Sequence, residues 1–130
     1  MTFSLPSPLS TVSLAICNDL NVSGPEPWTW EEGPYEVADY CISKKTNLLI
    51  LLDAWLDSGV DVEGKYDIEN LNYWAARLKP LWINPEEDRE DVSEFKGEET
   101  LVIVCNRRGK ENGKIIRLSF GINIIIHCLA

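Results

Sequence analysis

Apolar side chains recur at helical spacing near the start of the chain, after Ser7 and Pro8. A serine followed by a proline is a common helix start, with the hydroxyl as N-cap and the proline at the first helical position. The spacing predicts one amphipathic helix of about three turns. The positions that carry this pattern are Leu9, Val12, Ile16 and Leu20. Alternating apolar positions leave a strand over Thr11–Ile16 as the alternative.

Three more helices are predicted in the middle of the chain. Residues 35–43 form a short segment with one apolar face. Residues 48–56 (LLILLDAWL) are apolar nearly all round, as in a buried central helix, which would end at Gly59. A hairpin of these two segments is the alternative. Asp67 then provides an N-cap for an amphipathic helix over residues 68–78.

The last third of the chain changes to strand periodicity. Residues 100–105 (TLVIVC) are rich in β-branched side chains, and turn residues separate them from a returning strand over residues 114–120. A third strand is expected over residues 122–128. The whole pattern predicts an α+β fold, in which three or four helices in the N-terminal two thirds pack on a C-terminal antiparallel sheet of about three strands.

Charge is distributed unevenly along the chain. The 130 residues carry a formal net charge of −9 and are expected to form a single globular domain, residues 1–130. Residues 19–99 contain 20 acidic and 7 basic side chains, whereas residues 100–130 contain 1 acidic and 5 basic ones. We therefore distinguish a helical, acidic part (1–99) from a β-rich, mildly basic part (100–130). Such an acidic body repels nucleic acids and anionic membranes, and it favours a basic protein as partner.

Two tryptophans, Trp28 and Trp30, lie in a segment rich in proline and glycine (GPEPWTWEEGP, residues 24–34). An extended backbone would place both rings on one side of the segment. Tryptophan is enriched at binding hot spots. The two rings therefore either fill the core beneath a long loop or form an exposed anchor for a partner.

Little in the sequence supports catalysis or metal binding. The single histidine, His127, and the four widely spaced cysteines lack the short spacings of zinc sites, and no glycine-rich phosphate motif is present. We expect no metal, no cofactor and no catalytic residue, and the chain is predicted not to be an enzyme. The cysteines are expected to be free, with two disulfides as the alternative. The lack of a basic residue before the first apolar stretch argues against a signal peptide and favours a cytoplasmic location.

These features together predict a non-enzymatic acidic binding protein that neutralises a basic partner. Its most concrete form is a bacterial immunity protein against a nuclease-type toxin, whose cleft must be positively charged to hold phosphates. The predicted partner-binding residues are the two tryptophans and a set of acidic side chains: Trp28, Trp30, Glu31, Glu32, Asp57, Asp61, Glu63, Glu86, Glu87, Asp88, Glu90, Asp91 and Glu94. Two alternatives are a phage-encoded anti-defence inhibitor that imitates the charge of nucleic acid, and a small enzyme that depends on carboxylates or a cysteine.

Overall fold

The computed structural model describes residues 1–25, 27–56, 58–59, 67–82 and 100–106, and the strands at 109–111 and 114–116. Its strands are β1 (Thr2–Ser4), β2 (Thr11–Ile16), β3 (Leu48–Asp53), β4 (Leu101–Asn106), β5 (Gly109–Glu111) and β6 (Lys114–Ile116). Its α-helices are α1 (Glu36–Ser43) and α2 (Ile68–Arg77), and its 3₁₀-helices are η1 (Cys17–Leu20) and η2 (Lys79–Leu81).

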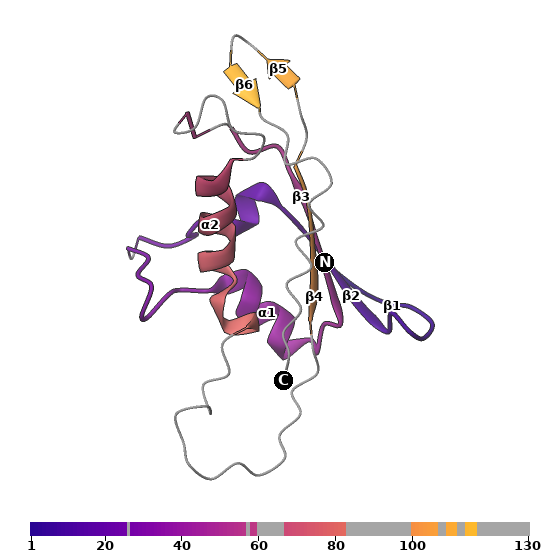
Figure 1. Cartoon of the computed structure of the whole chain (residues 1–130). Coiled ribbons are helices and arrows are strands. Elements are labelled where there is room, and N and C mark those ends of the chain that lie inside the picture. The colour runs from indigo at the N-terminus through magenta and orange to yellow at the C-terminus, as the bar shows by residue number, and fades with distance from the viewer. Residues whose placement is uncertain are drawn as a thin grey trace.

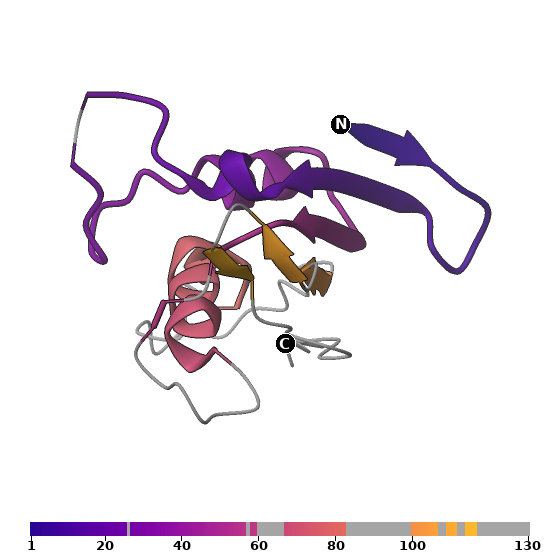
Figure 2. The same cartoon turned by 90° about the horizontal axis from the view of Figure 1, so that it is seen from above.

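Four of the strands form a mixed sheet in the order β1-β2-β3-β4. β1 is antiparallel to β2, whereas β2, β3 and β4 run parallel to one another. Figure 2 shows the sheet from above, with β1, in indigo, at its outer edge. Along the chain, α1 lies between β2 and β3 and α2 between β3 and β4, and both helices lie on the same side of the sheet (Figure 1). The three parallel strands are therefore joined by two helical crossovers, as parallel strands require.

Residues 11–16 of the segment predicted as the first helix form strand β2, so the helix prediction is wrong and its alternative, a strand over Thr11–Ile16, is confirmed. β2 pairs with β1 on one side and with β3 on the other. This pairing selects between two periodicities that residues 11–16 fit equally well. Ser7 and Pro8 begin no helix and lie instead in the turn from β1 to β2, where the Leu5 N–H donates to the Ser10 carbonyl (2.7 Å).

The apolar run predicted as a central buried helix is also a strand. Leu48–Asp53 form β3, which lies between β2 and β4 in the sheet. A parallel strand in the middle of a sheet lacks alternation and shows a continuous apolar run, which a buried helix shows as well. The alternative hairpin is wrong too, because Glu36–Ser43 form helix α1.

The short helix near residues 35–43 and the helix after Asp67 are confirmed. Asp67 caps α2 as predicted, since its carboxylate accepts a hydrogen bond from the Asn70 N–H (3.2 Å). The core lies between these two helices and the sheet. Its buried side chains include Ala15, Leu49, Leu51, Val102 and Val104 from the sheet, Ala38 and Cys41 from α1, and Trp74 and Leu78 around α2.

The C-terminal third follows the prediction only in part. A strand at residues 101–106 is confirmed, but β4 pairs in parallel with β3, and β6 pairs with β5. The predicted third strand at residues 122–128 lies outside the described residues. In the part of the chain that the structure describes, the fold is two α-helices on a four-stranded mixed sheet, with a separate two-stranded sheet. The prediction of three or four helices on an antiparallel sheet of about three strands is therefore wrong.

The sheet face opposite the helices, termed the outer face, carries apolar side chains near the carboxyl ends of the strands. Ile16, Leu52 and Cys105 are register partners on three neighbouring strands, and all three are exposed. The exposed fraction is 55% for Ile16 and 52% for Leu52. The preceding row is half-buried and consists of Leu14, Ile50 and Ile103. Parallel sheets are almost always covered on both faces, so the outer face has the character of a surface that packs against a second layer.

Candidate active site

The carboxyl ends of the parallel strands bring three polar or reactive side chains to one edge of the sheet. Cys17 directly follows β2, Asp53 is the last residue of β3, and Asn106 is the last residue of β4. Asp53 and Asn106 are register partners. Cys17 and Asp53 are the residues that follow the paired Ile16 and Leu52. Ligands of open α/β sheets bind at this edge, and we take Cys17, Asp53 and Asn106 as the candidate site.

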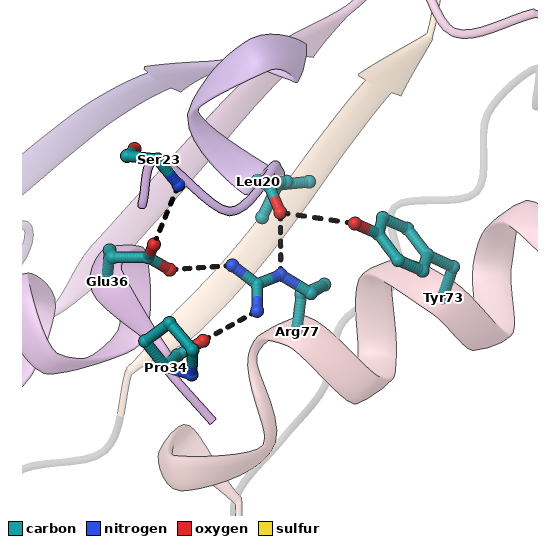
Figure 3. A network of polar contacts seen from close by, with 6 residues as sticks. All are labelled: Leu20, Ser23, Pro34, Glu36, Tyr73 and Arg77. Carbon is teal, nitrogen blue, oxygen red and sulfur yellow. Dashed lines mark hydrogen bonds and ion pairs between the residues drawn. The ribbon is translucent and has the colours of Figure 1, made fainter. Parts of the chain in front are cut away.

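Cys17 lies on a segment whose backbone is anchored on both sides. It is half-buried and is the first residue of η1. The Asp19 carboxylate accepts a hydrogen bond from the Ile16 N–H (2.8 Å), which closes the turn around the cysteine. At the far end of η1, the Leu20 carbonyl accepts hydrogen bonds from Arg77 Nε (2.6 Å) and from the Tyr73 hydroxyl (3.4 Å; Figure 3). Strand β2 and helix α2 therefore both fix the segment that carries the thiol.

The other two described cysteines have different environments. Cys41 is fully buried in α1, and burial raises the pKa of its thiol in spite of hydrogen bonds with Thr46 and Ser13. Cys105 is exposed on the outer face. All three described cysteines are free. Because reactive thiols are partly exposed and core thiols are inert, Cys41 is a structural residue, and Cys17 is the described thiol that lies beside the polar groups of the site.

Asp53 is a buried carboxyl group. It is 5% exposed, and neither carboxylate oxygen has a hydrogen-bond partner among the described residues. Alternation along β3 places it on the helix-covered face with Leu49 and Leu51. Burial raises its pKa from 3.8 to about 6. A buried charge without a partner is unfavourable, and residues with such perturbed pKa values are concentrated at functional sites.

The backbone that follows β3 is held by side chains from β4 and α2. Asn106 accepts a hydrogen bond from the Trp55 N–H (2.8 Å) and donates one to the Trp55 carbonyl (3.4 Å). Asp67 accepts hydrogen bonds from the Ser58 N–H (2.7 Å) and the Ser58 hydroxyl (2.8 Å). Although burial alone would raise it, hydrogen bonds from Ser58 and Asn70 hold the pKa of Asp67 below its ordinary value. The edge is therefore built from ordered backbone around the candidate site.

The two tryptophans of the predicted binding surface have different surroundings. Trp28 is half-buried, with its ring edge-on to Tyr35 at 6.3 Å between centroids and the Arg77 guanidinium 5.5 Å from its own centroid. Trp30 is 46% exposed, and the Lys79 ammonium lies 4.6 Å from its ring centroid. Trp28 therefore packs against the core, and Trp30 presents a partly open ring.

The acidic residues predicted to bind a partner lie largely outside the described residues. Glu31 and Glu32 are exposed in the turn closed by Thr29 and Gly33, next to Trp30. The others have no described position: Asp57, Asp61, Glu63, Glu86, Glu87, Asp88, Glu90, Asp91 and Glu94. The binding surface and its basic partner stay predictions.

Among the described residues, no group of three or more histidine, cysteine, aspartate or glutamate side chains could hold a metal ion. His127 lies outside these residues. No helix in the described part of the chain is long and apolar enough to cross a membrane. The candidate site offers a thiol, a carboxyl group and a carboxamide at one edge of the sheet, from Cys17, Asp53 and Asn106.

Comparison with known proteins indicates one enzyme to which the chain is similar. The protein N-terminal amidase of Schizosaccharomyces pombe (strain 972) is 32% identical to this chain over 120 residues. The chain is similar to an amidase. The match includes 80% of this chain and 36% of the relative, so the chain spans about a third of the relative's length. No model of a known protein family matches the chain, and no solved structure matches it.

The similarity to an enzyme overturns the functional prediction made from the sequence. It contradicts the non-enzymatic binding protein, its form as an immunity protein that inhibits a nuclease-type toxin, and the prediction that the chain is not an enzyme. The alternative of a small enzyme that depends on carboxylates or a cysteine agrees better with the amidase. A negative net charge keeps proteins of every functional class in solution, so charge by itself could not single out an inhibitor.

Cys17, Asp53 and Asn106 are not among the residues predicted to be functional. Each nevertheless ends an apolar run in the sequence: VSLAIC, LLILLD and LVIVCN. These positions indicate a site only if all three runs are assigned to parallel strands, because the carboxyl ends of parallel strands lie at the same edge of the sheet. Helices over the first two runs leave the three residues without a common position.

Proposed function

We propose that this chain carries the nucleophile of a cysteine-dependent amidase, and that Cys17 is that nucleophile. The observation that carries the proposal is the placement of a half-buried thiol at the carboxyl edge of the parallel strands, near Asp53 and Asn106. Thiolates serve as nucleophiles in acyl transfer because they are strong nucleophiles and form a hydrolysable thioester. The name of the relative supports an amide at a protein N-terminus as the substrate class.

The proposed reaction has two steps, with a thioester between them. The Cys17 thiol gives up its proton and its thiolate attacks the carbonyl carbon of the amide; a carbon–sulfur bond forms, and the carbon–nitrogen bond breaks as ammonia or an amine leaves with the proton that the thiol gave up. Water then attacks the thioester carbonyl, which restores the thiol and releases a carboxylic acid. Each step needs the sulfur atom at a fixed position relative to the carbonyl, and the anchored backbone of η1 supports such a position.

We further propose that a second polypeptide layer covers the outer face and completes the site. The exposed row of Ile16, Leu52 and Cys105 ends at the same edge as Cys17. The relative is longer than this chain, which matches 36% of it. We assign the occupant of the outer face to polypeptide that corresponds to the unmatched portion of the relative, because sheets packed face to face bury rows of aliphatic side chains.

The test is a chimera of the fission-yeast amidase in which the matched segment is replaced by this chain. Ammonia release is measured with peptides that carry a carboxamide side chain at the first residue, and with peptides that carry it at the third residue. We expect hydrolysis only of the former. Replacement of Cys17 by serine should lower the rate roughly a thousand-fold or more, because a serine hydroxyl is a far weaker nucleophile without a matched base.

Cys105→Ser is the matched control, since it makes the same sulfur-to-oxygen change at the same edge of the sheet but on the outer face. It should change the rate by no more than about two-fold, because Cys105 lies beneath the proposed second layer and serine is similar to cysteine in size. A chimera that stays fully active with serine at position 17 would disprove the nucleophile. An active Cys17→Ser variant that loses activity only on removal of Cys105 would move the proposal to the outer face.

A reducing, cytoplasmic location is part of the proposal. Its support is that all three described cysteines are free, because disulfides persist mainly in oxidising compartments. A catalytic thiol would also need such an environment to stay reduced.

A further inference from the structure

Arg77 is a buried cation whose hydrogen bonds join three separate segments of the chain. It is the last residue of α2 and is 2% exposed. Its Nε donates to the Leu20 carbonyl (2.6 Å), its Nη1 to the Pro34 carbonyl (2.6 Å) and its Nη2 to Glu36 Oε2 (2.6 Å; Figure 3). The guanidinium group therefore binds the end of η1 and the start of α1 at the same time.

Glu36 completes this arrangement and holds the chain just beyond η1. Its Oε2 accepts from Arg77, and its Oε1 accepts from the Ser23 N–H (3.1 Å). Although burial alone would raise it, hydrogen bonds from its own N–H, from Ser23 and from Arg77 hold the pKa of Glu36 below its ordinary value. Glu36 therefore carries its charge at neutral pH, and the pair fixes the segment 20–23 at both ends.

An ion pair of this kind contributes geometry more than stability. A buried ion pair can often be replaced by apolar side chains with little loss of stability, because desolvation offsets most of the attraction between the charges. The planar guanidinium group, in contrast, directs its hydrogen bonds along fixed directions. The apolar contacts of Trp74 and Leu78 already attach α2 to the sheet. The hydrogen bonds of Arg77 therefore hold the backbone at the end of η1 and the segment at the start of α1.

We infer that Arg77 is a positioning residue for the Cys17 thiol, and that Glu36 acts through it. Helix η1 has four residues, with Cys17 first and Leu20 last, so the carbonyl that Arg77 holds belongs to the same helical turn as the thiol. Strand β2 orients this turn from one side and Arg77 from the other. The inference rests on the proposed function, because it concerns the orientation of the proposed nucleophile.

The test measures the alkylation of individual cysteines in the folded full chain. Wild type, Arg77→Met and Glu36→Gln are treated with iodoacetamide, and labelling of each cysteine-containing peptide is followed over time by mass spectrometry. Cys105, which is exposed, reports the intrinsic rate of the reagent. Cys41, which is fully buried, reports opening of the whole fold. The quantity compared is the ratio of the Cys17 rate to the Cys105 rate.

Arg77→Met should raise this ratio about five-fold or more, because the freed turn opens locally and exposes the half-buried Cys17. Glu36→Gln should raise the ratio by a smaller factor, about two-fold, because Arg77 keeps its hydrogen bonds to the backbone in this variant. Labelling of Cys41, which reports the loss of global stability when one partner of the pair is removed, should rise less than labelling of Cys17. Lys79→Gln is the matched control: Lys79 donates to the Trp30 carbonyl (2.7 Å) and not to η1, so the ratio should not change.

An unchanged ratio in both Arg77→Met and Glu36→Gln would overturn the inference. A parallel rise at Cys17 and Cys41 in Glu36→Gln would overturn it as well, because it would assign the pair to the stability of the whole fold. If Arg77→Met does not fold, the ratio measured in Glu36→Gln tests the inference instead. Tyr73→Phe removes the longer hydrogen bond to the Leu20 carbonyl and should also raise the ratio. These rates do not depend on amidase activity, so they are separate from the outcome of the chimera assay.

Discussion

Replacement of Asp53 by asparagine should stabilise the protein at neutral pH and have little effect in acid. The Asp53 carboxyl group is 5% exposed and has no hydrogen-bond partner in the part of the chain that the structure describes. Burial raises its pKa from 3.8 to about 6. This rise of about 2 pKa units means that the native state disfavours the charged form of Asp53 by about 3 kcal/mol relative to the unfolded chain. Asparagine has nearly the same shape and no charge, so it removes this unfavourable contribution.

The direction of the pH dependence follows from the raised pKa. Between pH 3.8 and about pH 6 the native protein keeps the Asp53 proton, whereas the unfolded chain has released it. The stability associated with the neutral carboxyl group is therefore complete below pH 3.8 and is lost as the pH rises to about 6. The free energy of unfolding of Asp53→Asn, relative to wild type, should grow by about 3 kcal/mol from acid to neutral pH.

Urea unfolding, followed by tryptophan fluorescence, measures this difference at a series of pH values from about 3 to about 8. Asp39→Asn is the control, because it makes the same chemical change at an exposed position of α1, where the side chain is not buried. Equal effects of Asp53→Asn at acidic and neutral pH would refute the reasoning. A loss of stability that grows with pH would refute it more strongly, since it would mean that the ionised carboxylate has a favourable partner.

Two further predictions concern the helix cap and the outer face. Asp67→Ala should lower the free energy of unfolding by about 2–3 kcal/mol at neutral pH, because it removes the cap of α2 and both bonds to Ser58. Since the folded pKa of Asp67 is lowered, that loss should shrink as the pH falls through the acid range in urea titrations; a constant loss would contradict the assignment. Leu52→Lys should change the stability of the isolated chain by about 0.5 kcal/mol or less, yet reduce binding of an apolar fluorescent dye and self-association in size-exclusion chromatography. Leu51→Ala, on the opposite face of the same strand, should cost about 2–5 kcal/mol, and similar costs at the two positions would disprove the exposed outer face.

Local signals were enough to predict the two α-helices that the structure describes. Asp67, followed by apolar residues at helical spacing, predicts α2, and the structure confirms both the helix and its cap. The runs that became β2 and β3 carry no comparable local signal. Residues 48–52 are mostly leucine rather than valine or isoleucine, so composition favours helix, and only pairing with β2 and β4 makes the strand. Tertiary pairing overrode local preference there.

The candidate site depends even more on tertiary structure than the strands do. Cys17 and Asn106 are 89 residues apart in the sequence, and nothing near either residue indicates the other. Their relation is created by two parallel pairings, of β2 with β3 and of β3 with β4. The prediction assigned the runs of β2 and β3 to helices and confined the sheet to residues 100–128, so Cys17 and Asp53 did not lie at the end of any strand. The assignment of these two runs to helices therefore concealed the site.

The residues at the carboxyl edge are not those that would best stabilise this chain alone. On the helix-covered face, an asparagine at position 53 would avoid a buried charge, and on the outer face polar residues at positions 16 and 52 would avoid exposed apolar surface. Both departures occur at consecutive register positions, next to the thiol that begins η1. Departures from the stable choice are expected where a protein binds or reacts. Their coincidence at one edge favours an amidase site completed by a second layer over an acidic surface, because a charged surface would require neither of them.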